Sequence, residues 1–420
     1  MNKELIKQII IENQEFVRDI EIFPRNISFE QQGNYVLTGA RRTGKTYAMF
    51  QVIKDKLTTG VALSDILYIN FEDERLIEMK SEHLNLLLEA HAELFNSMPY
   101  MFLDEIQNIL GWEKFARRLA DQHYTTYITG SNAQMLSREI ATTLGGRFIT
   151  RDIHPLSFNE FLNVNHTQPE ENWEYSAQRF EIRKLFDSYF YYGGFPEITR
   201  FTEKKLWLQN LYNKIFFGDI VARYKIRNDF ALKLTIKKLA ESAHDEISFN
   251  RIRHIIQSAN VKIGTATIIE YIGYLKETWL LFGIKNFLAK TSEKETSGKY
   301  YFIDNGILSL FLMNAETILL ENLVANHLKQ KYGDELFYLK KNTEVDFYIP
   351  NEKTMVQVAY NINNTETETR EIKAMINLAA LVETKKMTII TLDTEKQIQY
   401  NNYIINIIPV WKWLLKDNKQ

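Results

Sequence analysis

The stretch GARRTGKT at residues 39–46 fits the phosphate-binding loop pattern G-x-x-x-x-G-K-[ST]. The apolar run 35–38 before it predicts a short buried strand, and the run from Tyr47 to Lys56 after it predicts a helix. In that context glycines let backbone N–H groups curl around phosphate oxygens at the positive end of the helix dipole. The sequence therefore predicts a nucleotide-binding loop, and the alternative is a chance match in a basic turn.

The loop residues can be assigned roles with ATP and Mg²⁺ as the expected ligands. Lys45 is expected to contact the β- and γ-phosphates, and the hydroxyl of Thr46 is expected to bind Mg²⁺. Two arginines inside the loop are unusual, and the sequence leaves open whether they contact phosphate or the acids Glu72 and Asp73. The predicted nucleotide-binding residues are Gly39, Ala40, Arg41, Arg42, Thr43, Gly44, Lys45, Thr46 and Tyr47.

A pair of acids supplies the second half of the predicted site. The apolar run 100–103 ends in Asp104 and Glu105. We expect Asp104 to hold Mg²⁺ together with Thr46, and Glu105 to orient and deprotonate the attacking water. Many strands end in surface acids, so the pair is informative only because it follows a well-placed phosphate loop. The second acid favours an ATPase that activates water over a GTPase-like switch.

Two further polar positions join Lys45 and Glu105 in the predicted catalytic set. Ser131 or Asn132, after the apolar run 124–129, is expected to hydrogen-bond the γ-phosphate or the water, and the alternative is a helix cap. Arg147 is a candidate arginine finger, which stabilises transition-state charge and often acts across a subunit interface. The alternative for Arg147 is an ion pair within a loop.

The first part of the chain alternates between helix and strand patterns. An amphipathic helix over 1–22 is expected to end at Pro24. Continuous apolar strands separated by helical patterns predict an α/β fold whose parallel sheet is covered on both faces. Ligands then bind at the carboxyl ends of the strands. The predicted strands are 35–38, 66–71, 100–103, 124–129 and 148–153.

Composition narrows the class of protein. A chain of 420 residues is expected to hold two or three domains. Its 51 basic and 53 acidic residues nearly cancel, so no global basic field indicates a nucleic-acid binder. Cysteine is absent, which excludes disulfides and thiolate metal sites. The N-terminus lacks a signal-peptide core and no apolar run reaches the roughly 18–20 residues of a membrane span, so a cytoplasmic location with no membrane partner is expected.

Beyond Pro155 the alternation stops. Residues 157–240 read as mostly helical, with a tight turn at 191–196. A helix ending near Ser258, a turn at 259–264, a helix over 265–275 and a strand over 279–284 predict a helix-turn-helix with a wing. The polar segment 288–299 is expected to be a loop. The remainder predicts mixed α and β structure, with strands at 301–303, 335–339, 345–349, 355–358 and 387–392 and helices at 321–331 and 369–383.

Motifs spread over nearly the whole chain resemble, in order, prokaryotic AAA-type ATPases of the archaeal-ATPase-like branch. This resemblance implies an additional-strand P-loop ATPase domain at 1–156, a helical lid at 157–240, a winged helix at 241–299 and a domain of restriction-endonuclease-like fold at 300–420. The motifs are TGARRTGKT (38–46), YINFED (68–73), FLDEIQNI (102–109), ITGSNA (128–133), GGR (145–147), HPLSFNEF (154–161), YYGGFPE (191–197), DIVARYKIRN (219–228), YYFIDNG (300–306), LLENLVANHL (319–328) and EVDFYI (344–349).

Nucleases of the PD-(D/E)xK kind use a helix Glu, a strand Asp and a following Glu-x-Lys, in which the acids bind Mg²⁺. Here Glu321 and Asp346 fit the two acids, and Gln357 takes the place of the last Glu as a neutral ligand. Ala359 stands where the lysine is needed and cannot replace it. We therefore expect a degenerate site without nuclease activity, on a fold still able to bind DNA or protein.

Two neighbouring features bear on that expectation. Lys340 and Lys341 lie close in sequence and are candidates to supply the missing charge. The alternative interpretation makes Glu344 and Asp346 an ordinary charged strand edge.

The expected recognition helix of the winged helix carries few basic residues. Lys262, Thr265, Thr267 and Lys276 lie near its ends, but Glu270 lies within it. DNA-binding helices normally make several phosphate contacts. Three hypotheses follow: an ATPase that couples turnover to a nucleic-acid or protein partner, an ATP-controlled DNA-binding protein, and a Mg²⁺ nuclease. The winged helix alternatively serves as a packing domain, and a homo-oligomer is compatible with a finger at Arg147.

Overall fold

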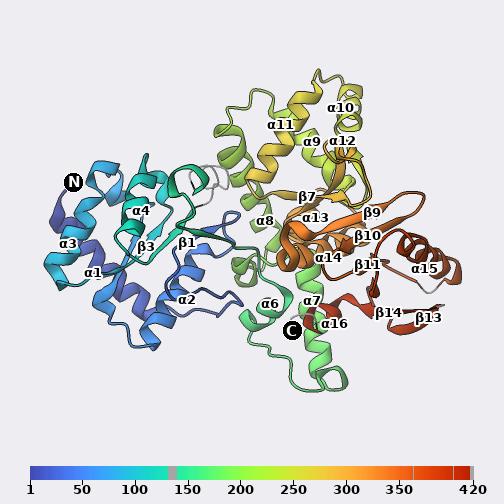
Figure 1. Ribbon diagram of the computed structural model, residues 1–420, viewed down its shortest axis with the longest axis horizontal. Coiled ribbons are helices and arrows are strands. Elements are labelled where there is room, and N and C mark those ends of the chain that lie inside the picture. The colour runs from blue at the N-terminus through green and yellow to red at the C-terminus, as the bar shows by residue number, and fades with distance from the viewer. Residues whose placement is uncertain (131–139, 363, 401, 417–420) are drawn as a thin grey trace. The chain divides into compact units, whose positions relative to one another are not determined.

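The computed structural model describes residues 1–130, 140–362, 364–400 and 402–416. Over these described residues the chain divides into two compact units, Met1–His154 and Pro155–Gln420 (Figure 1). The first unit contains the phosphate loop, and the second contains the residues for which a helical lid, a winged helix and a C-terminal domain were expected.

The first unit is built on a parallel sheet that, in the described residues, has five strands in the order β2-β3-β4-β1-β5. Each predicted strand is present, with ends within two residues of those expected. Because β4 lies between β1 and β3, the strand before the loop and the strand that ends in Asp104 are not neighbours. This order is typical of P-loop NTPases. The strands are β1 Tyr35–Thr38, β2 Ile66–Asn70, β3 Tyr100–Asp104, β4 Thr126–Thr129 and β5 Ile149–Asp152.

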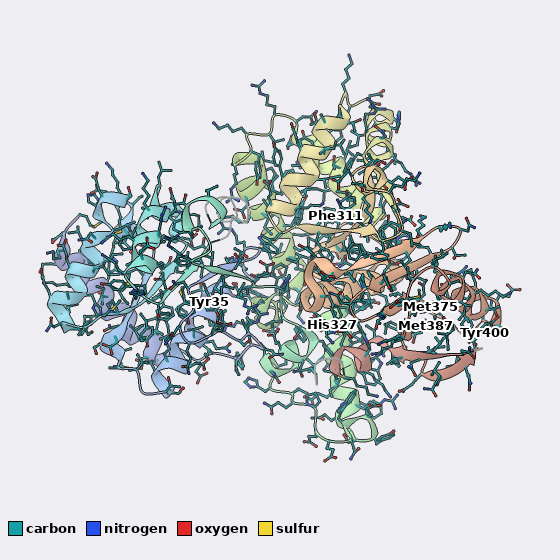
Figure 2. All side chains as sticks on the ribbon, viewed as in Figure 1. Tyr35, Phe311, His327, Met375, Met387 and Tyr400 are labelled. Carbon is teal, nitrogen blue, oxygen red and sulfur yellow. The ribbon has the colours of Figure 1, made fainter. Side chains whose placement is uncertain are left out.

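Helices cover both faces of this sheet (Figure 1). Val36 and Leu67 pack with α1 (Lys3–Asp19), α3 (Asn85–Phe95) and α4 (Trp112–Asp121). Tyr35, labelled in Figure 2, and Leu37 pack on the other side with α2 (Lys45–Thr58). Short helical turns complete the unit at Leu63–Asp65, Glu74–Leu76, Ser81–His83, Ile106–Asn108 and Ile140–Leu144.

Two expectations for this unit need correction. Helix α1 ends at Asp19 and not at Pro24, because Ile20 already has an extended backbone with ψ of 135°. Strand β5 is not covered on both faces, since it pairs with β1 at the edge of the sheet and its side chains are exposed.

The second unit begins with the helical region that the sequence predicts. At the predicted turn, the Gly194 amide donates to Asp304 Oδ2 at 2.7 Å. A Cβ on Gly193, where φ is +78°, would lie 1.9 Å from Asp304 Oδ1, so this position requires glycine. The elements are α6 Phe158–Val164, the turn Trp173–Tyr175, α7 Gln178–Tyr192, the turn Pro196–Arg200, α8 Lys204–Asn213, a π-helical segment Lys214–Ala222 and α9 Asp229–Glu241.

A helix-turn-helix follows, formed by α10 (Phe249–Ser258) and α11 (Thr265–Glu277). Strands β7 (Leu281–Asn286) and β8 (Ser297–Phe302) form the antiparallel wing. The expectation of a loop over 288–299 was wrong, because that segment holds α12 (Thr291–Lys294) and the start of β8. The polar side chains of this segment show no strand pattern. Its first residues nevertheless pair with β6 (Ile247–Ser248) and β7 through their backbone.

The wing strands continue into a large mixed sheet. Within the described residues it has nine strands in the order β13-β14-β12-β11-β10-β9-β7-β8-β6. Parallel pairing of β7 with β9 joins the wing to the C-terminal strands, so the expected segment border at residue 299 falls inside β8. The other elements are α13 Asn305–Ser309, α14 Glu316–Tyr332, the turn Gly333–Glu335, β9 Phe337–Lys340, β10 Glu344–Ile349, β11 Thr354–Val358, α15 Thr365–Ala379, β12 Lys386–Thr391, β13 Lys396–Tyr400, β14 Tyr403–Pro409 and α16 Val410–Lys416.

The core of the second unit is shared among its parts. A cluster of buried residues runs from Leu156 to Leu415 and includes side chains of the helical region, the helix-turn-helix and the sheet. A further core lies between α15 and the sheet and contains Met375 and Met387, both labelled in Figure 2. Apolar packing therefore holds the acidic residues described below on a common scaffold.

Candidate functional sites

The phosphate loop leaves β1 at Gly39 and enters α2 at Lys45. A Cβ on Gly39 would lie 2.3 Å from the carbonyl oxygen of Ile153, so only glycine fits there. Arg25 braces the loop by donating from Nη1 to the carbonyl oxygen of Thr43 at 2.9 Å and from Nη2 to that of His154 at 3.0 Å. No sequence pattern indicated this contact, because Arg25 lies outside every motif.

Inside the loop, the side chains of Thr43 and Lys45 donate hydrogen bonds to the loop's own backbone. Lys45 is buried, and its Nζ donates to the carbonyl oxygens of Gly39 at 3.2 Å and Ala40 at 2.9 Å. The Thr43 hydroxyl also donates to Ala40 O, at 2.9 Å. A buried ammonium held against main-chain carbonyls at the start of a helix is poised for a phosphate anion.

The residues that flank the loop differ in their surroundings. Arg41 Nη1 lies 3.9 Å from Glu72 Oε1, whereas Asp73 pairs with Arg75. Arg42 has a left-handed backbone with φ of +64°. Tyr47, on the first turn of α2, is exposed. The acid contact that the sequence left open for the two arginines is thus present for Arg41 at Glu72.

Asp104 lies at the centre of a hydrogen-bond network where β3 ends. Its Oδ2 accepts from Thr46 Oγ1 at 2.9 Å and from the Tyr68 hydroxyl at 3.0 Å, and its Oδ1 accepts from the Thr129 hydroxyl. Burial raises the pKa of Asp104, and the hydrogen bond from Thr129 partly opposes that rise. The structure therefore brings together Thr46 and Asp104, the two residues expected to bind the metal, and both carry the oxygen ligands that Mg²⁺ prefers.

Glu105 leaves the strand by a sharp turn. Its backbone is left-handed, with φ of +53°, and its amide donates to Thr129 Oγ1 at 2.9 Å. Its carboxylate accepts a hydrogen bond from the Gln107 side chain. The turn separates the two acids, so that Asp104 is buried while Glu105 stays partly exposed, as a base that must reach water requires.

The remaining predicted catalytic residues are Ser131 or Asn132, and Arg147. Ser131 and Asn132 lie outside the described residues. Arg147 Nε lies 2.5 Å from Asp121 Oδ1, at the end of α4, so in this chain it forms the ion pair that was the alternative to a finger.

The sequence did not point to Tyr68 and Thr129 as site residues. Thr129 ends β4, and β4 lies between the loop strand and the acid strand, which places its hydroxyl beside both acids. The strand-end position was visible in the sequence, but the strand order needed to choose Thr129 was not. Tyr68 is reached only through the pairing of β2 with β3.

A second acidic site lies in the second unit. Glu321 on α14, Asp346 on β10 and Gln357 on β11 are brought together and buried. The Asp346 amide donates to Gln357 Oε1 at 3.1 Å, and the Val358 amide donates to Asp346 Oδ2 at 2.9 Å. A cavity of about 880 Å³ opens at these residues and at α15. Ala359, by contrast, packs in the core under α15.

Lys299, from the segment expected to be a loop, is the cation of this site. Its side chain is 0% exposed, and its Nζ lies 2.6 Å from Glu344 Oε1, 3.0 Å from Asp346 Oδ1 and 3.1 Å from Glu321 Oε1. Lys340 contacts Glu344 at 2.9 Å and Glu246 at 3.2 Å, and Lys341 is exposed. Lysine is therefore present at the carboxylates, but it arrives from another strand.

These charges shift one another's pKa values. Burial alone lowers the pKa of Lys299, but the surrounding carboxylates, Glu321 foremost, raise it well above the usual value. Burial, helped by the charge of Asp346, raises the pKa of Glu321 to about 8. The Tyr301 hydroxyl donates to Glu321 Oε1 at 2.7 Å. Burial thus opposes the ionisation of Glu321, while the surrounding acids favour the charged form of Lys299.

The helix expected to recognise DNA offers few free cations. Lys262 and Glu270 are exposed, and the Thr265 hydroxyl donates to Asn250 Oδ1 at 2.9 Å. Lys276 Nζ lies over the ring of Tyr300, 5.2 Å from its centroid. Thr267 is half-buried. No helix in the part of the chain that the structure describes is long and apolar enough to cross a membrane.

Comparison with known proteins matches both units. Residues 31–162 match the model of an AAA domain, and residues 183–317 match a domain of unknown function (DUF8612). An uncharacterized protein of Methanocaldococcus jannaschii, MJ1544, is 36% identical, and the alignment covers 98% of this chain and 96% of that protein. An uncharacterized protein of Haemophilus influenzae is 29% identical over 91% of this chain and 94% of its own length. Among solved structures, the Walker-type ATPase PABY2304 of Pyrococcus abyssi aligns with 74% of this chain and 95% of its own, at 13% identity and a TM-score of 0.40.

Proposed function

The chain belongs to the same family as MJ1544 and carries an AAA-type P-loop ATPase domain, and on that premise we propose that it hydrolyses ATP and couples turnover to a nucleic-acid or protein partner. The observation that carries the proposal is the contact of Thr46 Oγ1 with Asp104 Oδ2 at 2.9 Å, beside the buried Lys45. A loop that only bound phosphate would not need a buried acid placed against its threonine.

Each residue of the nucleotide site has its own role in the proposed hydrolysis. Lys45 and the loop amides would bind the β- and γ-phosphates, and Thr46 and Asp104 would hold Mg²⁺. Mg²⁺, when bound, neutralises charge that develops on the phosphate oxygens. Glu105 accepts the proton of the attacking water, because its turn away from β3 leaves it partly exposed. Thr129 fixes the positions of both acids, because its hydroxyl donates to Asp104 Oδ1 and accepts from the Glu105 amide.

Two substitutions separate binding from hydrolysis. Lys45→Ala should abolish ATP binding, whereas Glu105→Gln should keep ATP binding and lower kcat by about 10²–10⁴-fold, the usual worth of a general base. Lys54→Ala on the same helix and Glu78→Gln on the surface are matched controls that should leave turnover unchanged. Steady-state ATPase rates with nucleotide-binding titrations give both quantities. Unchanged turnover in both site variants would refute the proposal.

In this proposal the second unit binds the partner to which ATP turnover is coupled. ATPase rates measured with single-stranded DNA, double-stranded DNA or no DNA test whether nucleic acid is the partner. Molar mass measured with and without ATP tests for a homo-oligomer. In such an oligomer Arg147 is a candidate to act across the interface, after exchanging its ion pair with Asp121.

A second candidate function is ATP-controlled DNA binding. The observation that favours it is the helix-turn-helix of α10 and α11 followed by the antiparallel pair β7 and β8. Lys262→Ala should then weaken DNA binding by the full chain and reduce its salt dependence, since each phosphate contact releases counterions. Absence of DNA binding at low salt, with or without ATP, would reject this function and leave a protein as the partner.

A further inference from the structure

The acids of the second unit stand where a restriction-endonuclease-like fold would hold a divalent cation. Such a cation needs several oxygen ligands, negatively charged in part, directed at one point. Glu321, Asp346 and Gln357 have suitable chemistry. In the described residues, however, no group of three or more acidic or histidine side chains is arranged to hold a metal ion. The residues that are present therefore do not fit the metal that the fold implies.

The reason is that the point between the acids is filled. Lys299 Nζ lies 3.0 Å from Asp346 Oδ1 and 3.1 Å from Glu321 Oε1, and it also contacts Glu344. These are hydrogen-bond distances to the same oxygens that a metal would need. The side chain is completely buried, so the ammonium sits beneath the carboxylates and away from solvent.

The sheet explains how a lysine reaches this point without the Glu-x-Lys motif. Lys299 belongs to β8, which pairs with β7, and β7 pairs in parallel with β9. Its ammonium lies over the ring of Tyr338 on β9, 5.8 Å from the centroid, on the way to Asp346 on β10. The wing of the helix-turn-helix therefore supplies the cation to the acids of the C-terminal strands.

Two lysines stand among the acids at the cavity. Lys299 and Lys340 carry two positive charges among the carboxylates of Asp346, Glu344 and Glu246. A divalent cation entering this cluster would meet the positive charge of Lys299 at its centre, 3.0 Å from Asp346 Oδ1 and 3.1 Å from Glu321 Oε1.

We propose that the ammonium of Lys299 permanently takes the place of a divalent cation in the C-terminal domain. The domain is then independent of metal and does not catalyse metal-dependent hydrolysis. Removal of Lys299 alone would leave the acids free to bind a divalent ion. The inference concerns the second unit and does not depend on ATP hydrolysis in the first.

The test counts bound Mn²⁺ on the full chain without nucleotide, by electron paramagnetic resonance of free Mn²⁺. Lys299→Met should bind one Mn²⁺ per chain more than the wild-type chain does. Adding Asp346→Asn to Lys299→Met should remove that ion. Lys340→Met is the matched control, since it deletes a cation that does not contact Asp346, and it should add no ion. Any Mn²⁺ at Thr46 and Asp104 is common to all variants and cancels in the comparison.

Three results would overturn the proposal. The first is a folded Lys299→Met chain that binds no additional Mn²⁺. The second is a wild-type chain that already binds a Mn²⁺ lost on Asp346→Asn, a comparison that stands even if Lys299→Met does not fold. The third is Mg²⁺-dependent DNA cleavage by the wild-type chain that Lys299→Gln abolishes, which would make Lys299 a catalytic lysine of an active nuclease.

Discussion

Replacing Lys299 by methionine should destabilise the second unit strongly. Two unit charges 3 Å apart attract by about 5–6 kcal/mol at the effective dielectric constant of about 20 that suits protein interiors. Burying the ammonium offsets several kcal/mol of that attraction. Removing one partner of a buried pair typically costs about 3–5 kcal/mol, because the remaining charges stay buried and unpaired. For Lys299, which contacts Glu344, Asp346 and Glu321, we expect a loss in that range.

The assay is urea unfolding followed by tryptophan fluorescence. Trp112 lies in the first unit, and the other tryptophans, at 173, 207, 279, 411 and 413, lie in the second. A Trp112→Phe background therefore confines the signal to the second unit. Lys340→Met is the control, because that partly exposed pair should be worth less than about 1 kcal/mol.

Neutral isosteres test the cause of the loss. Adding Glu321→Gln and Asp346→Asn to Lys299→Met should recover much of the stability, because the two most buried acids are then neutral and Glu344 keeps its contact with Lys340. A Lys299→Met chain that loses less than about 1 kcal/mol, or no more than Lys340→Met, would refute the reasoning that this ammonium neutralises buried acids.

Two further outcomes follow from single sites. The folded pKa of Glu321, about 8, lies above its unfolded value. Its contribution to stability is therefore complete below the unfolded pKa and is lost as pH rises through 8. We expect the free energy of unfolding to fall between pH 6 and 8 by at most about 1.4 kcal/mol per pH unit, and to fall more gently in Glu321→Gln. A slope unchanged by that substitution, in the same urea assay, would contradict the shift. Gly39→Ala should abolish ATP binding in a titration, because its Cβ would lie 2.3 Å from Ile153 O. Gly273→Ala within α11, where a Cβ meets no atom within 4 Å, should instead raise stability by about 0.5–1 kcal/mol and leave ATP binding intact.

The first unit could be predicted because its signals are local. The strand before Gly39, the glycines of the loop and the acids after residue 103 are each readable over a few residues. Chain order also placed the strands in a parallel sheet. Thr129 was missed because its role depends on β4 lying between β1 and β3, which is a property of the sheet order and not of any short segment.

The acidic site was only half predictable for the same physical reason. Glu321, Asp346 and Gln357 follow one another with the spacing of a known motif, and the structure brings them together. Lys299 precedes them in the chain and stands in a polar stretch, LAKTSEKETSGK, that resembles a loop. Its burial depends on β8 pairing with β7 and on β7 pairing with β9, contacts that no local pattern encodes.

The two sites differ in the partners of their buried charges. Lys45 donates to carbonyl oxygens of its own loop, and Asp104 accepts from hydroxyl groups. Those partners are neutral, so a phosphate or a metal ion that offers full charge can replace them. Lys299 instead contacts carboxylates, so a ligand must break charge-assisted bonds to a buried ammonium before it gains any. Lys45 and Lys299 are both buried lysines, but Lys45, a predicted nucleotide-binding residue, donates to loop carbonyl oxygens, whereas Lys299, the proposed permanent counter-ion, contacts carboxylates.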